Sequence, residues 1–181
     1  MTTATMPTIP TITAAAEDVR SADAEQLIRE LSAELAALYQ VSDGSAGFKP
    51  EDVEAPRSAF VIARYNGYPV GCGALRPLDE QTGEVKRMYT RSDYRRQGVA
   101  QAVLAELERL AVVFGYSTIK LQTGPKQLNA AALYERVGYY RIPRFSGNWE
   151  LVLAYQKDLH HTAGVGKAHH TLPHAERQEA A

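Results

Sequence analysis

The dipeptide Asn66-Gly67, placed between two apolar runs, is the feature that most restricts the fold of this chain. Both residue types tolerate the positive φ angles of a tight two-residue turn, so the dipeptide is a strong hairpin signal. It predicts that a strand over residues 59–65 pairs antiparallel with a strand over residues 68–75. The fold therefore contains a sheet with at least one antiparallel pair.

Residue periodicity predicts helices and strands on both sides of this hairpin. Leucines recur at helical spacing from Leu27 to Leu38, with Asp23 expected as the N-cap and Gln26 as its capping-box partner. Further strands are expected over residues 11–15, 84–90, 117–123 and 149–159, and further helices over residues 97–114 and 127–138. Helices interleaved with strands indicate the α/β class, with a mixed sheet covered by helices.

The length of 181 residues, 45% of them hydrophobic, suits one well-buried core and is short for two domains. A single domain is expected over residues 9–159. Residues 1–8 offer little apolar surface and are expected to be disordered. Residues 160–181 contain all five histidines and almost no large apolar residues, so a disordered tail is expected there too. The histidine spacing matches no metal-binding pattern, and no metal is predicted.

The formal net charge is -1, with a sequence pI near 6.5, so no basic field directs the chain to nucleic acid or to an anionic membrane. No run of apolar residues is long enough for a membrane span, and a cytoplasmic location is expected. The single cysteine, Cys72, excludes a disulfide framework and is expected to be a free buried thiol.

The stretch SDYRRQGVAQAVL, residues 92–104, places arginines and a glycine directly before a predicted helix. The first N–H groups of a helix have no partner within the helix, and the helix dipole adds positive charge there. Arg95 and Arg96 add full positive charges, while Gly98 permits close backbone approach and Ala100 keeps the first turn narrow. The stretch therefore predicts an anion site, with phosphate as the natural ligand. The chain lacks both a nucleotide P-loop and a dinucleotide glycine fingerprint.

Two motifs in the second half of the chain resemble those of the GNAT superfamily of acyl-CoA-dependent N-acyltransferases. The first is R-x-x-G-x-A opening a helix, formed by Arg95, Gly98 and Ala100. The second is A-x-x-x-Y before a helix-ending glycine, formed by Ala130 and Tyr134 ahead of Gly138 and Tyr139. The resemblance covers residues 58–157 and is closest to small bacterial enzymes acting on amino acids or other small amines.

The resemblance implies a fold and a cofactor. The fold is a mostly antiparallel twisted sheet of six or seven strands, splayed between the strands over residues 84–90 and 117–123. A bulge separates these two strands, and the pantetheine arm of acetyl-CoA lies in the gap against the backbone of Met88 and Thr90. The cofactor contacts implied for this sequence are Met88, Tyr89, Thr90, Arg95, Arg96, Gln97, Gly98, Val99, Ala100 and Gln127.

The resemblance also implies catalytic roles. Tyr134 occupies the position of the general acid that protonates the departing thiolate; its alternative role is packing on the sheet. Glu84 is the candidate base, acting through a water, and its alternative role is an exposed carboxylate paired with Lys86. Strand alternation predicts that Lys86 and Arg87 point to opposite faces. Arg87 or Arg76 is a candidate ligand for a carboxylate on the acceptor.

Three functions remain open from the sequence. The first is acetyl transfer from acetyl-CoA to a small primary amine, for example an amino acid. The second is acetylation of a protein lysine or N-terminus, and the third is acyl-CoA sensing without catalysis. The variable segments over residues 41–57 and 141–148 are expected to form the acceptor pocket, and a homodimer is possible.

Overall fold

The computed structural model describes residues 10–45 and 47–159. The two segments expected to be disordered, residues 1–8 and 160–181, lie outside the described residues, as do all five histidines.

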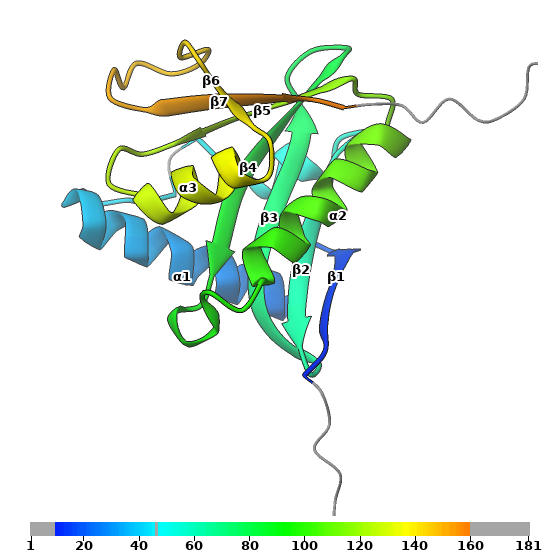
Figure 1. Cartoon of the computed structure of the whole chain (residues 1–181). Coiled ribbons are helices and arrows are strands. Elements are labelled where there is room, and N and C mark those ends of the chain that lie inside the picture. Colours follow the sequence, from blue (N-terminus) through cyan, green and yellow to red (C-terminus); the bar gives the residue numbers. More distant parts are fainter. Residues whose placement is uncertain (1–9, 46, 160–181) are drawn as a thin grey trace, which may run out of the picture.

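Within these described residues, seven strands form one sheet in the order β1-β2-β3-β4-β5-β7-β6 (Figure 1). The pair β4–β5 is parallel, whereas the other neighbouring pairs in the described sheet are antiparallel. The predicted mixed, mostly antiparallel sheet is therefore confirmed. The strands are β1 (Ile12–Glu17), β2 (Ala59–Tyr65), β3 (Tyr68–Pro77), β4 (Thr82–Thr90), β5 (Thr118–Thr123), β6 (Tyr140–Ile142) and β7 (Leu153–Asp158).

Helices cover both faces of the sheet (Figure 1). They are α1 (Ala22–Tyr39), α2 (Val99–Val113) and α3 (Leu128–Arg136), with short 3-10 turns η1 (Pro50–Val53) and η2 (Ser92–Tyr94). Alternate residues of β2 serve the two faces: Val61 and Ala63 pack in the core that contains α2 and α3, while Phe60 and Ile62 pack in the core that contains α1. The period of two in strand side-chain direction thus builds two apolar layers from one strand.

The Asn66-Gly67 hairpin is present as predicted. Tyr65 is paired with Tyr68, and the two turn residues have φ angles of 48° and 85°. Both values lie in the left-handed region that asparagine and glycine tolerate best.

The start of α1 differs from the prediction. The N-cap is Ser21, whose Oγ accepts a hydrogen bond from the Ala24 N–H at 3.2 Å, so the helix begins two residues earlier than expected. Asp23 lies inside the first turn and pairs with Arg64 at 2.8 Å. Gln26 donates to Glu30 at 3.0 Å and takes no part in a capping box. A serine already in extended conformation two residues upstream provides the cap instead.

The later boundaries also shift. Helix α2 starts at Val99 because Arg96 and Gly98 have φ angles of 64° and 89°, which an α-helix excludes. Trp149 lies in a loop before β7, which begins at Leu153. Strand β6 overlaps the start of the segment over residues 141–148, for which no strand is predicted, and its three residues are too few to show a periodicity in the sequence.

Helix α2 packs closely on β3 because Gly73 has no side chain. A Cβ atom at Gly73 would lie 2.7 Å from Val103 Cγ1 and 2.8 Å from Leu107 Cδ1. The glycine therefore sets the distance between the sheet and the helix whose N-terminus forms part of the candidate site.

Candidate active site

A cavity of about 720 Å³ lies at the end of β4, lined by residues of α1, α2 and α3 and of the loop that follows β4. Nine of the ten residues expected to contact the cofactor line it: Met88, Tyr89, Thr90, Arg95, Arg96, Gly98, Val99, Ala100 and Gln127. Tyr134 lines it as well, so the two sequence motifs converge on one cavity.

The parallel pair β4–β5 separates beside this cavity. Its pairing ends at Val85 with Leu121, although β4 continues to Thr90. On the other side of β4, the register with β3 shifts between Cys72 and Ala74, and Arg87 has a φ of 55°. This is a β-bulge, which bends the strand and ends regular pairing. The predicted splay of β4 from β5 is therefore present. The bulge lies in the pairing of β4 with β3, two residues after the last residue of β4 that is paired with β5.

The free edge of β4 carries hydrogen-bonding groups. The Arg91 N–H points to β3, where it donates to Val70 O at 2.9 Å. Because main-chain groups alternate along a strand, the N–H groups of Met88 and Thr90 point to the open side. Within the described chain, Thr90 Oγ1 is also buried without a hydrogen-bond partner. The two N–H groups can therefore donate hydrogen bonds to a bound molecule, whereas the Thr90 hydroxyl is covered by protein.

The N-terminus of α2 faces the same cavity and has no side-chain cap. Gly98 precedes the first helical residue in a left-handed conformation, and open space surrounds the position of its absent Cβ. The first-turn N–H groups at Val99 and Ala100 are therefore available to an anion.

The two glutamines expected to contact the cofactor both make hydrogen bonds within the chain. Gln97 does not line the cavity, and its amide donates to Asp93 O at 2.9 Å. Gln127 lines the cavity, but its Oε1 accepts hydrogen bonds from Gly124 N and Thr123 Oγ1 at 3.0 and 3.2 Å. Both side chains hold local turns.

Tyr134 comes from α3 and is 4% exposed. Its ring packs between Tyr139 and Tyr155, each with its centroid 5.8 Å away. Burial raises the pKa of the Tyr134 phenol above its ordinary value, because the phenolate would lose its hydration. The phenol is therefore a neutral donor at physiological pH.

Glu84 lies outside this cavity. It is 2% exposed, and its carboxylate is bonded by Arg76 at 2.8 Å and by Lys86 at 3.5 Å. Arg76 also pairs with Asp52 of η1 at 3.0 Å. Burial lowers the pKa of Lys86. The alternative role for Glu84 was an exposed carboxylate paired with Lys86. The pairing is present, but the carboxylate is buried.

Lys86 and Arg87 do not point to opposite faces as predicted. Arg87 donates to Gly44 O at 2.9 Å and to Ser45 O, and its guanidinium lies 5.4 Å from the Phe48 ring centroid. Lys86 Nζ approaches Gly47 in the same loop. The bulge at Arg87 breaks the strand alternation on which the prediction depended.

Several residues of the cavity carry no recognisable signal in the sequence. Lys126, beside the N-terminus of α3, and Arg136, in its last turn, add positive charge. Helix α1 contributes Leu31, Glu34 and Leu38 from far away in the chain. Within the described part of the chain, Arg96 and Arg136 have no ion-pair partner, so their charge is free for a ligand.

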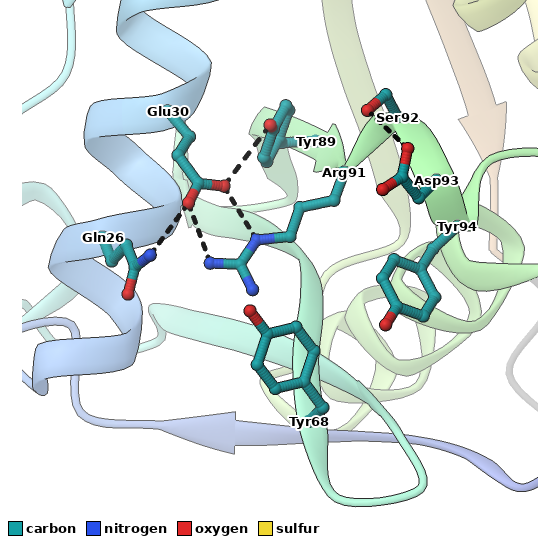
Figure 2. Close-up of a pocket in the computed structure, with 8 residues that line it drawn as sticks. All are labelled: Gln26, Glu30, Tyr68, Tyr89, Arg91, Ser92, Asp93 and Tyr94. Carbon is teal, nitrogen blue, oxygen red and sulfur yellow. Dashed lines mark hydrogen bonds and ion pairs between the residues drawn. The ribbon is translucent and has the colours of Figure 1, made fainter.

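A second cavity of about 470 Å³ shares Tyr89 and Tyr94 with the first. Figure 2 shows its wall, in which the Glu30 carboxylate of α1 faces the Arg91 guanidinium. This ion pair ties α1 to the residue immediately after β4.

Two further features are absent from the described residues. Residues 10–45 and 47–159 contain no group of three or more side chains suited to a metal ion. Within the same ranges, every helix is too short or too polar to cross a membrane.

The Acetyltransferase (GNAT) family model matches residues 24–139, which is more than half of the chain. An IAA acetyltransferase from Azospirillum brasilense is 32% identical over 133 residues, or 72% of this chain and 86% of that protein. The chain belongs to the GNAT acetyltransferase family.

Solved structures agree with this assignment. A Klebsiella pneumoniae protein assigned as an acyl-CoA N-acyltransferase aligns with a TM-score of 0.67 and 30% identity, covering 82% of this chain and 98% of that one. A GNAT family acetyltransferase from Elizabethkingia anophelis with acetyl-CoA bound aligns with a TM-score of 0.60 over 82% of this chain and 98% of that one. At 17% identity, this second match supports the fold.

Proposed function

We propose that this acetyltransferase moves an acetyl group from acetyl-CoA to the primary amine of a small molecule, such as an amino acid. The observation that carries the proposal is that one cavity joins the free edge of β4, the uncapped N-terminus of α2 and the Tyr134 side chain. Each part matches a different portion of a thioester of coenzyme A.

In this proposal the pyrophosphate lies against the N–H groups of Val99 and Ala100. Arg96 adds charge from the preceding loop. The main-chain groups of Met88 and Thr90 hold the pantetheine arm as an added strand, because the pairing of β4 with β5 ends before them.

The chemistry is direct transfer. The amine nitrogen attacks the thioester carbonyl carbon, the carbon–sulfur bond breaks, and the thiolate takes the Tyr134 phenolic proton. Burial keeps that proton on the phenol until the thiolate forms. An acyl-cysteine step is disfavoured because Cys72 is fully buried and burial raises its pKa to about 12.

Glu84 remains our proposed base for the amine proton. Since its carboxylate is buried against Arg76 and does not line the cavity, the proton would travel through a bridging water. Arg76 and Arg87 remain proposed ligands for a carboxylate on the acceptor. Each would first have to give up a protein partner, because Arg76 is paired with Asp52 and Arg87 donates to Gly44 O.

The test is thiol release from acetyl-CoA, followed against a panel of amino acids, other small amines and peptides. Small amines are expected to accelerate release more than peptides do. Faster release with peptides would favour the protein acetyltransferase, and CoA binding without accelerated release by any acceptor would favour the sensor.

A further inference from the structure

Two carboxylates of α1 hold two arginines of the loop that follows β4. Glu30 pairs with Arg91, and Glu34, one helical turn further on, pairs with Arg95. The acidic residues and the arginines are each four positions apart, so the two ion pairs lie one after the other along α1. The loop between these arginines leads directly into the uncapped start of α2.

The Glu30–Arg91 ion pair is held by several hydrogen bonds and is largely buried. Arg91 donates twice to Glu30, with both distances 2.8 Å (Figure 2). It also donates once to Pro69 O at 2.7 Å. Its side chain is only 12% exposed. The hydrogen bonds from Arg91 lower the pKa of Glu30, which Gln26 also contacts. Paired geometry of this kind is strong and specific.

The Glu34–Arg95 ion pair has a single hydrogen bond and is more exposed to solvent. Arg95 Nη2 meets Glu34 Oε2 at 2.6 Å, with the side chains 43% and 45% exposed. The Arg95 Nε donates to Thr90 O at 3.0 Å, on the strand whose free edge faces the cavity. Both partners line the cavity. An exposed ion pair of this type contributes little to stability and exchanges partners readily.

A carboxylate in the lining of a site disfavours the binding of a polyanion, because like charges repel. Glu34 neutralises Arg95 and adds negative charge to the cavity that the α2 N-terminus also lines, so a ligand phosphate must compete with it for Arg95. Arg96 and Arg136 need no such exchange, since both are free of ion pairs among the described residues.

We propose that Glu34 is a positioning residue that holds Arg95 in the empty site and releases it to the pyrophosphate of coenzyme A. This inference rests on the proposed function. Glu34 thereby limits the affinity for both acetyl-CoA and the product CoA, and this speeds product release. The neighbouring Glu30–Arg91 pair keeps the loop in place during the exchange.

The test compares Glu34→Gln with Glu25→Gln by calorimetric titration of CoA. Glu25 lies on the same helix and pairs with exposed Arg29 at 3.6 Å, so the control removes the same charge outside the cavity. Glu34→Gln is expected to lower the Kd for CoA about two- to five-fold. Glu25→Gln is expected to leave it unchanged.

Two further measurements separate the exchange from a general loosening of the site. S-acetylpantetheine lacks the pyrophosphate, so its KM is expected to stay the same in Glu34→Gln. In an Arg95→Gln background, the gain from Glu34→Gln is expected to fall well below its wild-type value, because the two residues act as a pair.

An unchanged or higher Kd for CoA in folded Glu34→Gln would overturn the inference, as would an equal gain with S-acetylpantetheine. Neither result touches the proposed function. Failure of the wild-type chain to bind CoA at all would instead remove the proposed function itself.

Discussion

Tyr134 is the residue whose chemistry can be isolated most cleanly. Tyr134→Phe keeps the ring that packs on Tyr139 and Tyr155 and removes only the proton donor. We expect kcat to fall by roughly 100-fold or more while the Kd for CoA stays within about two-fold. Steady-state thiol release and calorimetry measure the two quantities. Tyr140→Phe is the control, because Tyr140 does not line the cavity and its hydroxyl donates to Asp158. Wild-type turnover in Tyr134→Phe would exclude the acid role.

The direction of the Tyr134 pKa gives a pH dependence. Burial disfavours the phenolate, so the phenol stays protonated at pH values where an exposed tyrosine ionises. Activity that needs this proton is therefore retained as the pH rises to about 10, the ordinary tyrosine pKa. A kcat profile measured with saturating amine checks this, and an alkaline loss centred near pH 8 that Tyr134→Phe abolishes would contradict it.

Cys72 offers a probe of the intact fold. Its thiol is 0% exposed, and burial raises its pKa to about 12. At pH 8 we expect iodoacetamide to modify the native chain roughly 1,000-fold more slowly than the urea-unfolded chain, because both access and thiolate are lost. Mass spectrometry over time measures the ratio. Comparable rates in the two states would show that β3 is accessible from outside.

At the scale of single elements, the bulge in β4 predicts an unusual order of stability for variants at Arg87. Arg87→Ala and Arg87→Gly both remove the bonds to Gly44 and Ser45, but only glycine accepts a φ of 55° without strain. We therefore expect glycine to be more stable than alanine by roughly 1 kcal/mol, the reverse of their usual order inside a strand. Urea unfolding measures the difference. The usual order, with alanine more stable, would mean that the bulge disappears with the arginine.

The elements that the sequence predicts well are those with a local cause. The hairpin at Asn66-Gly67 depends on two adjacent residues, and α2 on one apolar stripe ended by Gly115. The bulge at Arg87 has no such cause, because it depends on the register between β3 and β4. Because of the bulge, Lys86 and Arg87 point to the same face of the sheet. The alternation of side chains along a strand cannot predict this.

The same distinction applies to the candidate site. The motifs predict the residues of β4, α2 and α3 that line the cavity, since these occur within one continuous stretch. Glu34 enters from a helix some sixty residues earlier, and only the folded chain brings it to Arg95. The burial of Glu84 likewise requires Arg76 and Asp52 from other elements.

At the scale of the whole molecule, ligand binding is expected to protect one region of the sheet and leave the rest unchanged. In hydrogen exchange, CoA should slow the amides of Met88, Thr90, Val99 and Ala100, which the proposal places against the pantetheine arm and the pyrophosphate. Amides of the β1–β2 pair should exchange as before, because neither strand lines the cavity. Slowing spread evenly over the sheet would indicate general stabilisation and not a bound cofactor at this edge.

Among the residues that the structure describes, the sheet has one parallel pair, β4–β5, and this pair limits how such a site can change over evolution. A connection between parallel neighbours leaves the end of β4, returns through α2 and begins β5 on the same side as β4 began. The start of α2 therefore lies at the carboxyl end of β4, which is also where the gap between β4 and β5 opens. Substitutions can strengthen or weaken binding there, but only a different chain connectivity can move the site to another edge.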